Sequence, residues 1–319
     1  MRLGRLATSL AAALTLGAAA IARAEPLDVS LLKLGPPDPA VWVALGADPA
    51  QAGTLSADAK RRFAILSNDV ALAMSSALLQ PGSTTGHSGW DVALEGTYSS
   101  VHDAAIGTAQ LGFGDRPWAT TSVTPSALVG SGIHVRKALP FSFEMGGRLT
   151  YLAMTSYVAA QGEAKWALNE GFDYFPDVAV RAAYTRLFGQ TEWNLDTTDL
   201  DVLVSKRWGV SAVTSFTPYV AARFTFVNAS SERMDFANAP SLNAPPGTTT
   251  FAGFPNLRTN LYRTTLGVRM TANAVSLAVE GTYFAGTKHS GDASPAAGDY
   301  PDFRLASSWS AAFRLGWEF

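Results

Sequence analysis

Apolar and polar positions alternate along most of the chain, most clearly in its last stretch, residues 309–319. Successive side chains of a β-strand point to opposite faces, so this alternation predicts a strand with one apolar and one polar face. The apolar face is rich in aromatic side chains, which is unusual for a soluble sheet. It consists of Trp309, Ala311, Phe313, Leu315, Trp317 and Phe319.

The same two-residue period recurs from about His87 onwards and predicts ten strands. The clearest of them runs from Phe141 to Tyr151, with apolar residues at odd positions and Glu144 and Arg148 at even positions. The connections after the first, seventh and ninth strands are long and polar, whereas those after the second and eighth are short. Long loops at one end and short turns at the other are typical of membrane barrels.

The distribution of apolar side chains favours a barrel over a soluble β-sandwich. In most of the ten strands one face is apolar and aromatic, and the other carries charges of both signs. Lipid offers no partners to backbone polar groups, so a sheet that spans a membrane must close on itself. We therefore predict an all-β fold for residues 87–319, a transmembrane antiparallel up-and-down β-barrel of about ten strands. Eight or twelve strands remain alternatives, because Val41–Leu45 or the long loops could supply another hairpin.

Residues 1–24 form a predicted signal peptide. A positive start at Arg2 and Arg5 precedes an apolar, alanine-rich stretch, and Ala22-Arg23-Ala24 has the form of a cleavage site. We expect export and cleavage after Ala24.

Residues 25–86 form a predicted N-terminal segment that contains a helix. Apolar residues recur every three or four positions over 57–79, up to Pro81-Gly82, which predicts an amphipathic helix. Its apolar face could pack under the barrel on the periplasmic side or fill the lumen as a plug. The period of the pattern does not choose between these positions.

Composition narrows the classes of function. Cleavage would remove three arginines and change the formal net charge from -2 to -5, and no run of Lys or Arg is longer than Lys60-Arg61-Arg62. Nucleic acid is therefore not an expected partner. The chain has no cysteine, which excludes disulfides and thiolate metal sites. We expect no cofactor and no metal.

The final strand resembles the terminal strand of Gram-negative outer-membrane β-barrels, in which aromatic residues alternate and a Phe comes last. The resemblance implies a location in the bacterial outer membrane. It also implies two partners: the lipids of that membrane, and the barrel-assembly machinery, which would recognise residues 309–319.

The polar faces of the predicted strands should line the lumen. With Asp91, they carry eight positive and eight negative side chains. A strongly ion-selective pore would have an excess of one sign at its constriction, so this balance indicates ion pairs across the interior. The predicted lumen-lining residues are Glu95, His134, Arg136, Glu144, Arg148, Glu163, Lys165, Arg181, Asp199, Asp201, Arg223, Arg263, Arg269, Glu280, Arg314 and Glu318.

The order of signal, helix-bearing segment and barrel resembles, in layout alone, the FadL-type transporters of hydrophobic compounds. That layout implies a lumen closed by the N-terminal segment. A barrel of about ten strands is only a little wider than one of eight strands, which its own side chains nearly fill. We therefore expect a narrow porin-like channel or a transporter for small or hydrophobic solutes.

Two other functions stay open. A structural or adhesive barrel could act through its outer loops, of which Ser230–Pro255 is the longest. A protease or lipid-modifying enzyme of the outer membrane could use His102-Asp103, or His289 with Asp292, as base and orienting group. The chain has no G-x-S-x-G and no H-E-x-x-H motif. We do not expect an enzyme, and we assign no catalytic residue.

Overall fold

The computed structural model describes residues 25–34, 57–75, 77–86, 88–101, 118, 125–235, 251–289 and 300–319. The predicted signal peptide, the Val41–Leu45 run, His87, the pair His102-Asp103 and Asp292 lie outside the described residues.

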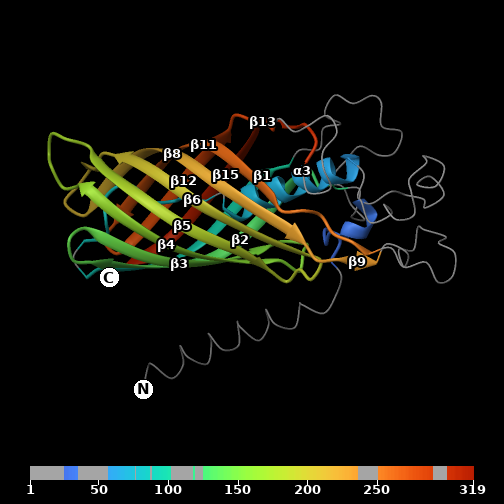
Figure 1. The fold of residues 1–319 in the computed structure, drawn as a ribbon. Coiled ribbons are helices and arrows are strands. Elements are labelled where there is room, and N and C mark those ends of the chain that lie inside the picture. Colours follow the sequence, from blue (N-terminus) through green and yellow to red (C-terminus); the bar gives the residue numbers. More distant parts are fainter. Residues whose placement is uncertain are drawn as a thin grey trace, which may run out of the picture.

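Ten long antiparallel strands close into one barrel, which confirms the predicted fold class and strand number (Figure 1). The last strand pairs with the first, and β8 pairs with β11, so the ladder has no free edge among these ten strands. The strands are β1 (Trp90–Ser100), β2 (Ala127–Leu139), β3 (Phe143–Leu152), β4 (Val158–Asn169), β5 (Asp177–Phe188), β6 (Trp193–Ser205), β8 (Thr214–Ser231), β11 (Leu257–Ala272), β12 (Val275–Phe284) and β15 (Ser308–Glu318).

Buried and exposed residues alternate along the barrel strands. In β5 every second side chain is buried inside and the ones between are exposed or half-buried on the outer face. The outer face carries large apolar side chains that lie side by side on neighbouring strands. Phe143 and Trp166 stack with ring centroids 5.4 Å apart, and Tyr98 stacks on Trp309 at 5.3 Å. An apolar outer band with a charged interior is the architecture of an outer-membrane β-barrel.

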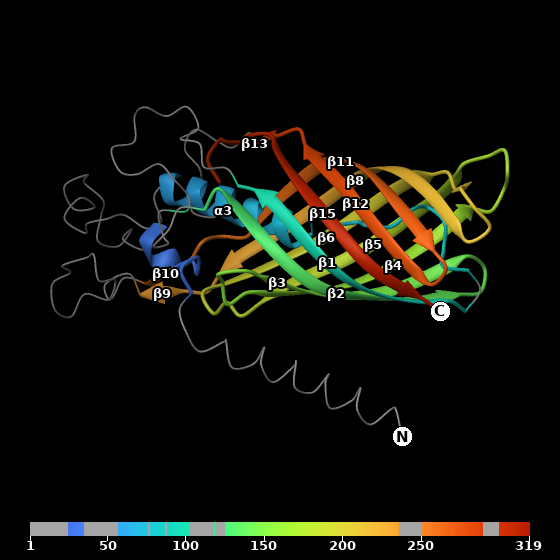
Figure 2. The ribbon, with the colours of Figure 1, turned by 180° about the vertical axis from the view of Figure 1, so that it is seen from behind.

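The two ends of the barrel differ, and we name them by their connections. The turn end holds the C-terminus and the connections 140–142, 170–176, 206–213 and 273–274 (Figure 2). At the loop end lie the strand ends that the remaining connections join, those between β1 and β2, β3 and β4, β5 and β6, β8 and β11, and β12 and β15. Short strand pairs extend beyond the barrel at both ends. They are β7 (Trp208–Gly209), which pairs with β8 at the turn end, and at the loop end β9 (Met234–Asp235) with β10 (Phe251–Ala252) and β13 (Thr287–His289) with β14 (Phe303–Leu305).

The N-terminal helix α3 (Ala57–Met74) lies inside the loop end of the barrel (Figures 1 and 2). A short 3-10 helix, η2 (Leu31–Leu34), lies near the same end. None of the described helices is long and apolar enough to cross a membrane.

The lumen around α3 is apolar. Phe63, Leu66 and Val70 of the helix are fully buried, and inward side chains from many strands pack around them. A helix satisfies its own backbone hydrogen bonds, so it can lie in an apolar channel without further polar partners. The surrounding residues include Leu128, Leu152, Leu187, Leu195, Val227, Leu261 and Phe284.

The predicted C-terminal end of the helix was wrong. The sequence pattern extended the helix to residue 79, but α3 ends at Met74, and the chain continues without helix through residues 77–86. Leu79 has a φ of 53°, which a right-handed helix cannot contain. The physical reason is that charged side chains of the lumen bind the backbone groups of this stretch, which a helix would have bonded internally. We call residues 77–86 the lumen segment.

The backbone places the start of β3 and the side chain of Asp196. β3 begins at Phe143, not at Phe141, because Phe141 and Ser142 both adopt left-handed φ angles in the turn. Asp196 lies on the outer face of β6 near the loop end, where the amide of Asn228 donates a hydrogen bond to its carboxylate at 3.1 Å. The register of β6 with β8 runs without a break, so Asp196 needs no bulge.

The outer position of Phe313 gives a first prediction. Phe313 is 63% exposed at mid-strand, so Phe313→Arg would place a charge in the hydrocarbon and should lower the free energy of unfolding by about 2–4 kcal/mol. Phe313→Leu, the control, should change it far less. Urea unfolding in lipid vesicles measures the difference. Equal stability of the two variants would contradict the assignment of this face to lipid.

Candidate functional site

The predicted lumen-lining residues lie inside the barrel. All are buried except Glu318, which is half-buried at the turn end and pairs with Arg269. They gather between α3 and the turn end, and we call this charged half of the interior the lower lumen.

Asp91 joins two arginines at the seam between the first and last strands. Its two carboxylate oxygens pair with Arg136 of β2 and with Arg314 of β15. Arg136 also donates to Glu144 at 3.0 Å, and Glu144 pairs with Lys165 at 3.1 Å. Neighbouring strands bring these side chains to one level of the lumen, where each charge meets an opposite one.

His134 bridges two carboxylates in the middle of the lumen. Its Nδ1 lies 2.9 Å from Glu95, and its Nε2 lies 3.1 Å from Glu163. Arg148 pairs with Glu95 at 2.7 Å, and Arg181 pairs with Glu163. The ion pairs therefore continue from one side of the barrel to the other.

The far wall carries a second group of pairs. Asp201 holds Arg181 at 2.6 Å and Arg223 at 2.9 Å, and Asp199 holds Arg263 at 2.7 Å. Breaking such a buried pair by removing one partner is costly, since the other charge stays behind without compensation.

The lumen segment passes through this network and binds it by its backbone. The N–H groups of Leu78 and Leu79 both donate to the carboxylate of Glu280, each at 2.6 Å. The hydroxyl of Tyr219 donates to the same carboxylate at 2.8 Å. Three hydrogen bonds therefore satisfy Glu280, for which no ion pair is found among the described residues.

Arginines bind carbonyl oxygens just after the helix. Arg223 and Arg263 donate to the carbonyl of Ser75 at 3.1 and 3.0 Å, and Arg148 donates to that of Ala77 at 2.6 Å. Ser75 and Ala77 both follow Met74, the last residue of α3, so their carbonyl groups have no partner within the helix.

The lumen segment keeps polar partners down to the turn end. Lys165 donates to the carbonyl of Ser83 at 3.0 Å, and the N–H groups of Thr84 and Thr85 donate to Glu170 and Glu144 at 2.7 and 3.1 Å. Beyond them an open vestibule of about 550 Å³ faces the turn end. Its lining includes Ser83, Thr84, Gly86, Glu170, Asp177 and Lys206.

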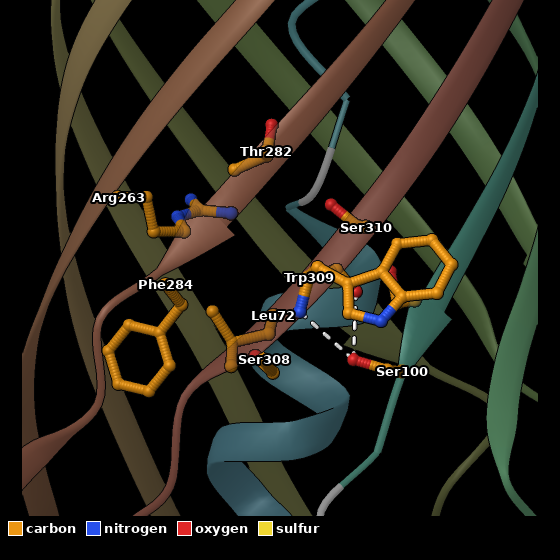
Figure 3. Close-up of a pocket in the computed structure, with 9 residues that line it drawn as sticks. Leu72, Ser100, Arg263, Thr282, Phe284, Ser308, Trp309 and Ser310 are labelled. Atoms are coloured by element: carbon orange, nitrogen blue, oxygen red, sulfur yellow. Dashed lines mark hydrogen bonds between the residues drawn. The ribbon is translucent and has the colours of Figure 1, made fainter.

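The inner end of α3 lies close to one side of the barrel wall. A cavity of about 10 Å³ separates Leu72 from β1, β11, β12 and β15 (Figure 3). That volume is about what one water molecule needs. Beside it, the Ser100 hydroxyl bridges the backbone N–H and carbonyl of Trp309 at 3.0 and 2.9 Å. The helix therefore leaves little space on this side of the lumen.

The loop end holds the start of the N-terminal segment. Leu31 donates its N–H to Glu192 at 2.5 Å, and Val29 donates to the Tyr157 hydroxyl at 2.8 Å. Partial burial raises the pKa of Glu192, and the Leu31 N–H opposes that shift. Phe254, in the long loop, stacks on Phe63 of α3 with centroids 4.4 Å apart. A loop residue thus covers the helix from outside.

Some contacting residues escaped the sequence prediction. Tyr219 lies on the inner face of its strand, and its position in the alternation was the available signal. Gln80 binds both Arg136 and Glu163, at 2.8 and 3.0 Å, but it lies between the predicted helix and Pro81, where no period marks the direction of a side chain. Glu170 lies in a turn, where no alternation marks the direction of a side chain.

Of the four residues considered for an enzyme, only His289 lies within the described part of the chain. The ring of His289 stacks on Phe303 at 4.8 Å. In the part of the chain that the structure describes, no group of three or more His, Cys, Asp or Glu side chains is arranged to hold a metal ion.

No family model and no curated protein matches the sequence. Solved structures of similar shape are barrels of outer-membrane proteins. The N-terminal β-barrel domain of Pseudomonas aeruginosa OprF is 12% identical, with 73% of this chain and 99% of that chain covered and a TM-score of 0.29. Ail of Yersinia pestis is 9% identical, with 73% and 100% covered and a TM-score of 0.28. The translocator domain of the autotransporter NalP from Neisseria meningitidis is 9% identical, with 85% and 100% covered and a TM-score of 0.36.

The pairing of Asp91 with two arginines gives a second prediction. Asp91→Asn leaves Arg136 and Arg314 buried with one anionic partner fewer and should lower the free energy of unfolding by about 3 kcal/mol. Asp196→Asn, on the outer face of the barrel, should cost no more than about 1 kcal/mol. Equilibrium unfolding of both variants in the same vesicles tests this, and equal losses would show that the buried network is not what stabilises the seam.

Proposed function

We propose that this outer-membrane barrel is a closed channel or transporter that passes small or hydrophobic solutes once residues 57–86 leave the lumen. One observation carries the proposal: these residues occupy the interior from the loop end to the turn end. The cavity between Leu72 and the strands on one side of it is about the size of one water molecule. A solute cannot pass through that cavity while α3 is in place.

The contacts of the lumen segment favour a displaceable plug over a permanent core. Its hydrogen bonds join backbone groups to charged side chains. When such a segment leaves, water can replace both partners, so each bond contributes only about 0.5–1.5 kcal/mol net, and about 1.5–3 where a charge takes part. Around α3 the contacts are apolar, and there a hydrophobic compound would have to replace the helix, because water would not.

The two halves of the lumen differ in polarity, so they would accept solutes of different kinds. The walls around α3 are apolar, and displacement of the helix would expose them to a hydrophobic compound. The lower lumen is polar and has both signs of charge, which disfavours strong selection between anions and cations. The vestibule at the turn end leads to the lumen segment, so one side of the passage is already open.

The direction of the barrel follows from its connections. In outer-membrane barrels the long loops are extracellular and the short turns periplasmic. The helix would then close the outer half of the passage, and the vestibule would face the periplasm. Recognition of residues 309–319 by the barrel-assembly machinery and cleavage after Ala24 remain part of the proposal.

Single-channel recording in a planar bilayer tests the proposal. The intact mature protein should be silent, and the protein lacking residues 25–86 should conduct steadily, because the lumen has lost what fills it. Circular dichroism must show the same strand content in both.

Two outcomes would contradict the proposal. Steady conductance of the intact protein would mean that residues 57–86 do not close the passage. Silence of both proteins would favour a sealed barrel that acts through its loops, as a structural or adhesive protein does.

A further inference from the structure

We propose that the lower lumen is a binding site for a non-helical polypeptide backbone, and that short unstructured peptides are the small solutes that the barrel passes. This inference rests on the proposed function and names its substrate. The lumen segment then occupies a site that a peptide from outside the chain can take.

The lumen segment is bound mainly through groups that every peptide carries. The barrel contacts N–H and carbonyl groups of the main chain, which do not depend on the side chains. Gln80 and Thr84 add side-chain hydrogen bonds. The backbone groups bound by barrel side chains are those of Ser75, Ala77, Leu78, Leu79, Pro81, Gly82, Ser83, Thr84 and Thr85.

The lumen offers acceptors for the N–H groups of a peptide backbone and donors for its carbonyl groups. Carboxylates of Glu280, Glu144 and Glu170 accept from N–H groups. Basic side chains, such as Arg148 and Lys165, donate to carbonyl groups. A backbone has donors and acceptors but no net charge, so a lumen with both signs fits it. A site for an ion would instead need an excess of one sign.

Glu280 shows how far the backbone has adapted to the wall. Two consecutive N–H groups point at its carboxylate, and Leu79 takes a left-handed φ of 53°. Leucine rarely adopts this conformation, whereas successive N–H groups in such a turn form a well-known anion-binding arrangement. The carboxylate therefore determines the local conformation.

The two leucines of the lumen segment lie in small apolar clusters. Leu78 clusters with Ala167, Ala179, Ala221, Leu203 and Tyr219, and Leu79 with Ala77, Ala278 and Ala312. Most of these wall residues are alanines, which contact a side chain without a polar group that would select its chemistry. The hydrogen bonds to the backbone therefore outnumber the contacts that depend on the sequence of the segment.

The conformation of the bound chain is itself selected. An α-helix has already used its backbone groups, so it gains nothing from charged walls. Accordingly α3 ends at Met74, where the charged side chains begin, and the chain continues without helix. The partners come from opposite sides of the barrel, among them β3, β4, β8 and β12, and so hold a chain that runs along the axis.

Proline substitutions in the full-length protein test the role of the backbone N–H groups. Proline has no N–H, so Leu78→Pro removes one hydrogen bond to Glu280, and Thr85→Pro removes the one to Glu144. Leu78→Ala and Thr85→Ala are the matched controls, since they shorten the same side chains and keep the N–H. Both proline variants should open the channel more often than their alanine controls in single-channel recordings. Equal opening within both pairs, with the barrel intact by circular dichroism, would overturn the proposal.

A synthetic peptide with the sequence of residues 75–86 tests the site directly on whichever proline variant conducts. It should block the current, and a peptide of the same composition in scrambled order should block similarly. Methylation of the two leucine amide nitrogens should raise the blocking concentration at least about tenfold, because it removes the hydrogen bonds to the carboxylate.

The outcomes separate this inference from the proposed function. If the deletion protein conducts but no peptide blocks the proline variants, the proposed channel stands and the peptide site is overturned. If the native peptide blocks the current and the scrambled peptide does not, the site recognises side chains. That result would overturn the claim that unstructured peptides in general are bound. Block by native and scrambled peptides, lost on methylation, is the expected result.

Discussion

The structure depends on one constraint, that every backbone N–H and carbonyl group away from water needs a partner. In the wall this constraint closes the sheet, because β15 completes the ladder with β1 and leaves none of the ten strands with a free edge in the hydrocarbon. In the interior the same constraint divides the N-terminal segment into two parts. The helix makes its own backbone hydrogen bonds and packs in an apolar cluster, whereas the non-helical part takes its backbone partners from charged side chains.

The charged side chains of the interior have two roles: they join neighbouring strands, and they bind the backbone of the lumen segment. Both roles need charges of both signs. Pairs such as Asp91 with Arg136 and Arg314 join neighbouring strands across the seam. Glu280 instead has no ion pair among the described residues, and its carboxylate accepts from two backbone N–H groups and a tyrosine. A lumen of one sign could do neither, because its charges would repel one another and would bind only the donors or only the acceptors of a backbone.

Much of the fold could be predicted because the side-chain period of a strand is independent of its partners. The alternation placed Arg148, Glu163 and Asp201 on the inner face, and the structure buries all three there. The prediction failed at the C-terminal end of the helix, where contacts with distant residues override the local sequence pattern. Residues 75–79 continue the helical period of α3, but Arg223 and Arg263 bind the carbonyl of Ser75, and Glu280 binds the amides that follow. No pattern within the segment itself reports these partners, which lie more than a hundred residues away.

The sequence by itself determined the strand period, the outward direction of the aromatic residues and the inward direction of the charges, since each follows from the two-residue repeat. It also determined that a helix precedes the barrel. Only the tertiary structure decided where that helix lies, where it ends and which charges pair. An apolar helix face can be buried against any apolar surface, and the closure of ten strands provided one inside the loop end. Below it, the closed wall brought charges from distant strands within hydrogen-bonding distance of the chain, and there a non-helical backbone is the stable conformation.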